Sequence, residues 1–277
     1  MIPFDFEYYQ PQTAESAAST FHKLEKCGKE PRYYGGGTEI ISMARVGNLY
    51  AGAVVDIKGI PECRELGFRQ DELVIGSGVT LTQIAESGLF PLLGKCAGRV
   101  ADHTIQGKIT LGGNLAGTII YREASLPLLL ADTNVVVQSP DSRRTVPLTA
   151  VYDGEMHLAP GEFLLQFLIP REFTELPYVH VKRTKADKID YPLVTVAALR
   201  RGDRLRFAFS GLVPKPFRST AVEGILNNRL VHPKERVDAM LRALPEPVLA
   251  DNGGSPEYRA FVLKTILLNT FDALEGA

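Results

Sequence analysis

Two glycine-rich stretches contain the residues best suited to bind a ligand in this chain of 277 residues. The first glycine stretch is YYGGGTEI (33–40), and the second glycine stretch is TLGGN (110–114). Successive N–H groups in a glycine turn form a concave anion site, and the missing Cβ lets a phosphate approach the backbone. Thr38 and Thr110 add hydroxyl groups, and Asn114 adds an amide. Together the stretches predict a diphosphate site; the alternative is two unrelated tight turns.

The glycine spacing matches neither of two common nucleotide-binding loops. A Rossmann loop reads G-x-G-x-x-G, and Ile40 stands where the last of those glycines would be. A Walker loop reads G-x-x-x-x-G-K-[ST]. The segment GLFPLLGKC (88–96) has one residue too many between its glycines and a cysteine in place of the hydroxyl. The sequence therefore favours a glycine cradle of another kind.

The remaining reactive side chains do not form a recognisable site. Cys27, Cys63 and Cys96 are widely spaced and include no C-x-x-C pair, so we expect neither a disulfide framework nor an iron–sulfur cluster. The 5 histidines are scattered, with no H-x-H or H-x-x-x-H pair. We therefore expect no catalytic residue and no metal site on this chain, and any chemistry would come from a bound cofactor.

Composition is that of an ordinary soluble protein, with 45% hydrophobic residues, 23% charged residues and a formal net charge of −1. This balance, without a basic stripe, argues against nucleic-acid binding. No stretch approaches the roughly 18 uncharged apolar residues of a membrane span, and the first residues lack the pattern of a signal peptide. We expect a cytoplasmic protein with no membrane contact.

Short helices and strands must position the glycine stretches. Thr13 is a plausible N-cap for a helix over residues 13–27, and Gly28 is a natural stop. A short helix is expected over residues 39–45, directly after the first glycine stretch. Further predicted segments are strands at 51–57, 72–81 and 161–170, an apolar helix at 91–102, a helix running into a strand at 125–139, a hairpin turn at 201–203, and helices at 219–228 and 256–274. This mixture of elements predicts an α+β protein with two domains.

The order YYGGGTEIIS, VVDIKGIPECREL, LVIGSGVTL, ITLGGNLAG, LPLLLADTNVVVQS and GEFLLQFLIP resembles the FAD-binding subunit of the molybdenum hydroxylases, which include xanthine dehydrogenases and carbon monoxide dehydrogenase. The resemblance covers nearly the whole chain. It implies a two-lobed FAD-binding domain of the vanillyl-alcohol-oxidase (PCMH) type over residues 1–172, with lobes of about 1–55 and 56–172. A smaller α+β domain of the carbon monoxide dehydrogenase flavoprotein type, a sheet with helices, would follow over residues 173–277.

The resemblance also implies which residues bind FAD. In the family the first loop wraps the pyrophosphate with backbone amides, and the second completes the cradle. The cofactor-binding residues implied in this way are Tyr33, Tyr34, Gly35, Gly36, Gly37, Thr38, Glu39, Ile40, Thr110, Gly112, Gly113 and Asn114. On this basis Gly36→Val should abolish FAD binding and leave the fold largely intact, because the new side chain would occupy the pyrophosphate position.

The resemblance implies two further FAD-contacting residues, and the sequence departs from the family near the first of them. The family usually carries a Ser-Asp or Gly-Asp pair after the second loop, and here YREA (121–124) replaces it; before that loop, IQGK (105–108) replaces an I-R-N-like tripeptide. Glu123 would be the acid that meets the ribose or ribityl hydroxyls; alternatively it forms an ordinary surface pair with Arg122. Tyr191 falls where the family places a segment near the flavin ring.

The resemblance implies an electron-transfer subunit of a larger enzyme. A molybdenum-pterin subunit would hydroxylate the substrate and a 2Fe-2S subunit would relay electrons, which FAD on this chain would pass to NAD⁺ or another acceptor. Xanthine or a related purine is the expected substrate. One alternative is a stand-alone flavoenzyme of the vanillyl-alcohol-oxidase type, although residues 171–277 are short for a substrate domain and lack clustered His, Tyr and Arg. Another is a nucleotide-binding regulatory module without redox chemistry.

Overall fold

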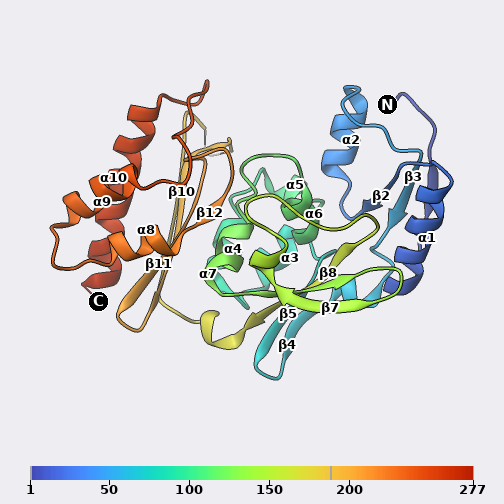
Figure 1. The fold of residues 1–277 in the computed structure, drawn as a ribbon, viewed down its shortest axis with the longest axis horizontal. Coiled ribbons are helices and arrows are strands. Elements are labelled where there is room, and N and C mark those ends of the chain that lie inside the picture. Colours follow the sequence, from blue (N-terminus) through green and yellow to red (C-terminus); the bar gives the residue numbers. More distant parts are fainter. Residues whose placement is uncertain (1, 188, 277) are drawn as a thin grey trace.

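The computed structural model describes residues 2–187 and 189–276, which form three β-sheets in a row along the longest axis of the molecule (Figure 1). Helices cover these sheets, so the α+β class expected from the sequence is confirmed. Within the described residues, no helix has the length and apolarity needed to cross a membrane.

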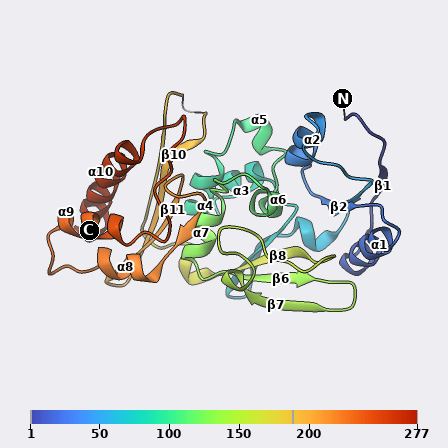
Figure 2. The same cartoon turned by 45° about the horizontal axis from the view of Figure 1, so that its top comes forward.

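The N-terminal sheet is parallel and has the strand order β1-β3-β2. Its elements are β1 (Glu7–Tyr9), α1 (Ala14–Lys26), β2 (Pro31–Tyr34), α2 (Thr38–Arg45) and β3 (Ala53–Asp56). The side chain of Thr13 accepts the Ser16 N–H at 3.1 Å and caps α1, as its position in the sequence predicted. Helix α1 packs on β2 and β3 at the end of the molecule farthest from the C-terminal sheet (Figure 2).

The middle sheet is antiparallel, with the strand order β4-β5-β8-β6-β7. Its strands are β4 (Leu66–Arg69), β5 (Glu72–Gly76), β6 (Asn134–Gln138), β7 (Arg143–Pro147) and β8 (Phe163–Pro170). The helices of this part are α3 (Leu81–Ser87), α4 (Pro91–Ala97), α5 (His103–Gln106), α6 (Leu111–Ala116) and α7 (Ser125–Leu130), with 3₁₀ turns at Pro61–Arg64 and Leu148–Ala150. Their apolar faces and the sheet enclose one large hydrophobic cluster.

The C-terminal sheet is antiparallel, with the strand order β12-β11-β10-β9. It contains β9 (Tyr178–Thr184), β10 (Pro192–Arg201), β11 (Arg204–Ser210) and β12 (Phe217–Arg218), and it follows a 3₁₀ turn at Arg171–Phe173. The helices are α8 (Thr220–Leu226), α9 (Pro233–Arg242) and α10 (Pro256–Glu275). Helix α10 contacts β9 and β10, while α7 from the middle part also contacts β10 and β11. Strand β10 is thus buried along most of its length, which explains its continuous apolar sequence.

Three segments differ from the sequence-based expectation, and the first two lie near the glycine stretches. The strand expected over residues 72–81 ends at Gly76, because Thr80 and Gln83 form a capping box that starts α3. The second glycine stretch is the beginning of helix α6, with Thr110 as its N-cap. Helix α9, which the sequence reading missed, begins at a His232–Pro233 pair.

Candidate functional site

The first glycine stretch joins β2 to α2 and leaves its backbone donors free. Gly37 has φ +72°, a left-handed conformation that glycine adopts readily, and it precedes the first turn of α2. The first backbone bond of the helix runs from Ile41 N to Gly37 O at 2.9 Å. Among the residues that the structure describes, none accepts a hydrogen bond from the N–H groups of residues 36–40. These amides and the positive end of the helix dipole make an anion site.

The second glycine stretch uses its backbone donors within the fold. The donor–acceptor pairs are Leu111 N to Val79 O at 2.9 Å, Gly112 N to Ser77 O at 2.9 Å, Gly113 N to Thr110 Oγ1 at 3.2 Å and Asn114 N to Thr110 O at 2.8 Å. A group that already donates to protein cannot also donate to a phosphate in the same geometry. The prediction of a second open nest at 110–114 is therefore wrong.

The two glycine stretches instead pack directly against each other. A Cβ atom on Gly36 would lie 1.6 Å from the backbone oxygen of Lys108, and one on Gly35 would lie 2.7 Å from Thr110 Oγ1. A Cβ atom on Gly37 would lie 2.2 Å from the ring of Tyr34. The expectation that Gly36→Val leaves the fold intact is therefore wrong, because the side chain meets protein backbone before it meets any ligand.

Glu39 and Asn114 connect these stretches to the segment that follows α6. The Glu39 carboxylate accepts the Thr118 N–H at 2.8 and 3.0 Å and the Thr118 hydroxyl at 3.1 Å. Asn114 Oδ1 accepts the Ala124 N–H at 3.3 Å. Within the described part of the chain, the Thr38 hydroxyl and the Asn114 side-chain nitrogen have no acceptor, so both donors are left for a ligand.

The two tyrosines of the first glycine stretch have different roles. The ring of Tyr33 lies between Phe21 and Phe163, at centroid distances of 4.4 and 4.6 Å, and its hydroxyl donates to Gly161 O at 2.6 Å. Burial raises the pKa of Tyr33. Its side chain therefore packs against the core of the N-terminal part, whereas the ring of Tyr34 contacts Gly37 and supports the turn.

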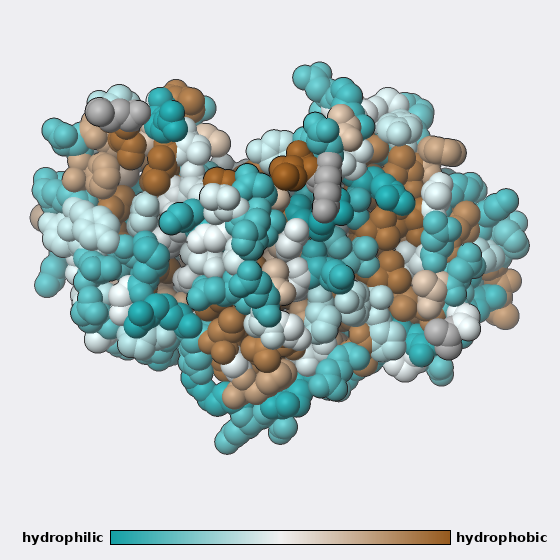
Figure 3. All heavy atoms as spheres, turned by 180° about the vertical axis from the view of Figure 1, so that it is seen from behind, coloured by the Kyte–Doolittle hydropathy of each residue, from teal (hydrophilic) through white to brown (hydrophobic). Residues whose placement is uncertain are grey.

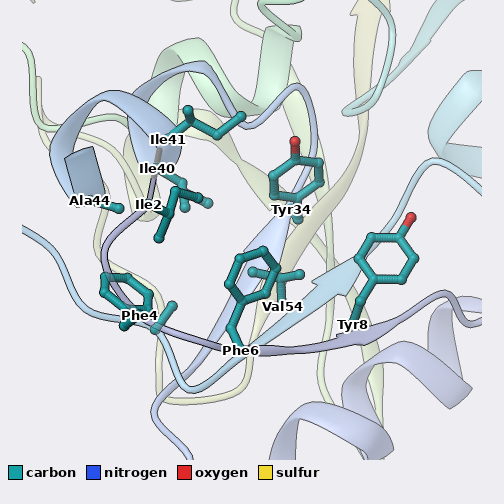
Figure 4. A pocket seen from close by; sticks show the side chains of 10 residues that line it. Ile2, Phe4, Phe6, Tyr8, Tyr34, Ile40, Ile41, Ala44 and Val54 are labelled. Carbon is teal, nitrogen blue, oxygen red and sulfur yellow. The ribbon is translucent and has the colours of Figure 1, made fainter.

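Ile40 lines an apolar hollow of about 230 Å³ beside the first turn of α2. Figure 4 shows that residues of the N-terminal segment, including Phe4 and Phe6, form one wall of this hollow, with Ile40 and Tyr34 among the residues facing them. A second hollow of about 300 Å³ lies between β9 and α10, where Phe261 is 67% exposed. Figure 3 shows hydrophobic side chains gathered on this C-terminal lobe.

Glu123 lies in the contact between the middle part and the C-terminal sheet. One carboxylate oxygen accepts from Lys182 Nζ at 2.6 Å, and the other accepts the Thr195 hydroxyl at 2.6 Å. Burial raises the pKa of Glu123, against the opposing effect of Lys182. The carboxylate is buried and both of its oxygens already accept from protein, which argues against the expected contact with a ribose or ribityl hydroxyl. The alternative, a surface pair with Arg122, is wrong, because Glu123 is buried.

Tyr191 lies beside Tyr121, which comes a few residues after the second glycine stretch. The two rings stack at a centroid distance of 5.0 Å with an interplanar angle of 20°, and Tyr191 is 60% exposed. Thr118, which binds Glu39, and Tyr121 lie in the same short segment. This segment therefore links the first glycine stretch to the aromatic pair.

Sequence reasoning missed a charged pair directly behind the first glycine stretch. Lys58 Nζ donates to Gly35 O at 2.8 Å and to Asp56 Oδ2 at 2.8 Å. Asp56 is the last residue of the buried strand β3 and is only 1% exposed, although it is charged. An acid at the end of an apolar strand, with a lysine two residues later, was the available signal. Among the described residues no group of three or more His, Cys, Asp and Glu could hold a metal ion.

Comparisons with known proteins identify relatives of this architecture. Residues 4–172 match the family model described as the FAD binding domain in molybdopterin dehydrogenase. The chain is 27% identical over 270 residues to the xanthine dehydrogenase FAD-binding subunit of Escherichia coli O157:H7, covering 93% of this chain and 90% of the relative. It is 25% identical over 195 residues to the carbon monoxide dehydrogenase medium chain of Hydrogenophaga pseudoflava, covering 68% and 67%.

Solved structures show the same fold. Carbon monoxide dehydrogenase from Hydrogenophaga pseudoflava, in a form that lacks the Mo-pyranopterin moiety of the molybdenum cofactor, superposes with a TM-score of 0.87 at 22% identity, covering 100% of this chain and 99% of the other. Quinoline 2-oxidoreductase from Pseudomonas putida 86 gives a TM-score of 0.84 at 21% identity, covering 99% and 98%. The expected two-lobed FAD-binding fold is confirmed.

The site fits the cofactor of this family. A diphosphate carries charge and many acceptor oxygens, and the free N–H groups of residues 36–40 offer a matching row of donors. The family match covers more than half of the chain. The chain therefore belongs to the family of FAD-binding domains of molybdopterin dehydrogenases, and FAD is its cofactor.

Proposed function

We propose that this chain is the electron-transfer subunit of a multi-subunit molybdenum hydroxylase and that the first glycine stretch holds the FAD diphosphate. The observation that carries the proposal is the row of free N–H groups over residues 36–40. Residues 36–40 are partly exposed and include the first turn of α2, so their free N–H groups can be met by an anionic partner or by solvent. The family match to residues 4–172 supports the first of these.

The chain's own residues would bind and orient FAD. The Thr38 hydroxyl and the Asn114 side-chain nitrogen add donors beside the backbone amides. The second glycine stretch and Lys108 pack against Gly35 and Gly36 and hold the first stretch in place. When bound, FAD supplies a ring that accepts electrons singly and releases them as a pair. The stacked pair of half-buried Tyr121 and exposed Tyr191 would border that ring, at the far end of the segment that begins near Thr118.

The partners would be an iron–sulfur subunit and a molybdenum-pterin subunit, with NAD⁺ or another compound as the electron acceptor and xanthine or a related purine as the substrate. The names of two relatives, a xanthine dehydrogenase FAD-binding subunit and a carbon monoxide dehydrogenase medium chain, support this assignment. In this proposal residues 1–172 bind FAD, with lobes of about 1–55 and 56–172, and residues 173–277 form the second domain. The cytoplasmic location stays a prediction.

A titration of the flavin-free chain with FAD tests the binding site. We expect one FAD per chain, and Thr38→Val should weaken binding about tenfold, because it removes one hydrogen bond to a charged group. Thr220 is the first residue of α8, as Thr38 is of α2, so Thr220→Val is a matched control that should bind FAD normally. No binding at saturating FAD, or equal affinity of the two variants, would contradict the assignment.

The flavin absorbance of the FAD-loaded chain under anaerobic conditions separates the acceptors. Bleaching by NADH would support NAD⁺ as the acceptor, because hydride transfer is reversible. Bleaching by dithionite but not by NADH would point to another acceptor. Bleaching by xanthine without partner subunits would contradict the multi-subunit proposal and favour the stand-alone flavoenzyme.

A further inference from the structure

We propose that Lys58, Asp56 and Tyr8 form a positioning network that fixes the Gly35–Gly36 peptide, so that the Gly36 N–H faces the diphosphate. This inference rests on the proposed function, because it requires the diphosphate to lie at the first glycine stretch. Its basis is a set of contacts behind that stretch, on the side of β3.

Asp56 anchors the network. It is the last residue of β3 and pairs with Tyr34 of β2 in the strand register. Its buried carboxylate accepts the Lys58 N–H at 2.8 Å and Lys58 Nζ at 2.8 Å, and it also accepts the Tyr8 hydroxyl. Hydrogen bonding to Asp56 raises the pKa of Tyr8 to about 12, so this hydroxyl stays protonated and remains a donor at neutral pH.

Lys58 connects this anchor to the first glycine stretch. Its ammonium group donates to Gly35 O at 2.8 Å and lies 4.4 Å from the centroid of the Tyr34 ring. The Tyr34 ring in turn lies against Gly37. A cation held by a carboxylate, a carbonyl and an aromatic face has a defined position, although its side chain is 41% exposed.

Peptide geometry transmits this position to the binding surface. The described chain contains no cis peptide, so Gly35 C=O and Gly36 N–H lie on opposite edges of one plane. Because the oxygen points toward Lys58, the N–H points away from it, and no described residue accepts that N–H. If this plane turned over, a carbonyl oxygen would face the diphosphate in place of a donor.

A run of glycines makes such control necessary. Glycine reaches both signs of φ at little cost, so a peptide between two glycines rotates more freely than any other. The bond from the Lys58 ammonium also polarises the peptide, which strengthens its N–H as a donor. Lys58 therefore contributes through the Gly35–Gly36 peptide and is a positioning residue.

FAD affinity of three single variants tests the network. Lys58→Met removes the ammonium group and keeps much of the apolar stem, and we expect FAD to bind about tenfold more weakly, the loss of one charge-assisted contact. Lys58→Arg restores a cationic donor and should recover most of the affinity. Lys29→Met is the matched control, since Lys29 forms an exposed ion pair with Glu7 of β1 and the change in net charge is equal. It should bind FAD as the wild type does.

The double variant Asp56→Asn/Lys58→Met separates positioning from folding. Lys58→Met alone leaves a buried carboxylate without its cation, which destabilises the fold, whereas the double variant removes that charge. We expect the double variant to regain thermal stability while its FAD affinity stays about tenfold lower. Recovery of normal affinity in the double variant would overturn the proposal, as would equal affinity of Lys58→Met and Lys29→Met.

The NMR signal of the Gly36 amide reports the local environment of this peptide and does not depend on the overall stability of the fold. In the flavin-free protein we expect this ¹⁵N–¹H signal to shift in Lys58→Met, to return in Lys58→Arg and to stay in place in Lys29→Met. An unmoved signal in Lys58→Met would overturn the proposal. Failure of the wild-type chain to bind FAD would instead contradict the proposed function, so the two failures are distinguishable.

Discussion

The two glycine stretches have similar composition but opposite use of their backbone donors. In the first, the N–H groups of residues 36–40 have no acceptor among the described residues. In the second, residues 111–114 all donate to protein oxygens. The difference arises from their neighbours. The first stretch follows the end of β2, where no protein acceptor among the described residues faces its N–H groups, whereas the second lies beside residues 77–79, whose carbonyl oxygens accept from it. Glycine content therefore does not show whether a turn binds a ligand or supports another turn.

The largest expected effect comes from adding a side chain to Gly36, where the two glycine stretches are in contact. Gly36→Val places a Cβ atom 1.6 Å from Lys108 O, so the two turns must separate. We expect a loss of about 4 kcal/mol in the free energy of unfolding and loss of FAD binding. Chemical denaturation of the flavin-free protein measures the first effect.

The control for this substitution is Gly67→Val in β4, where a Cβ atom has no neighbour within 4 Å. This variant should keep both stability and FAD binding. A Gly36→Val protein as stable as Gly67→Val would show that the two stretches do not pack as described.

The second largest effect is expected at Glu123. Like the amides of the second glycine stretch, both oxygens of this carboxylate are hydrogen-bonded to protein. Glu123→Gln leaves the Lys182 ammonium buried without its counter-charge, so we expect a loss of about 3 kcal/mol in the free energy of unfolding. FAD affinity of the folded variant should stay normal, because this carboxylate lies in the contact with the C-terminal sheet. A selective loss of FAD affinity with unchanged stability would reverse this assignment.

Hydrogen exchange compares the two stretches directly. With FAD at 100 times its dissociation constant, exchange of the amides of residues 36–40 should slow by up to about 100-fold, the factor set by mass action. The amides of residues 111–114 should already be protected in the flavin-free protein, since they donate to protein oxygens. Equal protection changes in both segments would remove the distinction between them.

The smallest expected effect tests the supporting role of the second stretch. Thr110 caps α6 through the Gly113 N–H, and Thr110→Ala should cost about 1 kcal/mol of stability, as for other N-cap substitutions. Thr110→Ser keeps the capping oxygen and should behave like the wild type. If Thr110→Ala lowered FAD affinity more than it lowered stability, the hydroxyl would have to contact the ligand.

Local signals in the sequence predicted much of the fold. The Thr13 cap, the stop at Gly28 and the hairpin at Gly202 all depend on nearby residues, and each appears where it was expected. The strand expected over residues 72–81 was too long, since an apolar run does not reveal the capping box that ends it at Thr80. The resemblance to a family came from the order of such segments, and the family match confirms it.

The site itself was only partly predictable. Gly35, Gly36 and Gly37 stood out because ordering three consecutive glycines costs backbone entropy. In the structure other protein atoms lie so close to each of the three that a Cβ atom would clash. The contacts of Glu123 with Lys182 and of Tyr33 with Gly161 could not be predicted, because these partners are distant in sequence. Lys58 was overlooked for the same reason, since its contact with Gly35 forms only when β3 lies beside β2.

The sequence by itself determined the elements, their caps, the positions of both glycine stretches and the family. These depend on spacing along the chain, where a side chain meets residues three or four positions away. The tertiary structure decided which N–H groups remain free, which carboxylates are engaged and which glycines face protein. Those outcomes depend on contacts such as Gly36 with Lys108 and Glu123 with Lys182, whose partners come together only when the sheets pack.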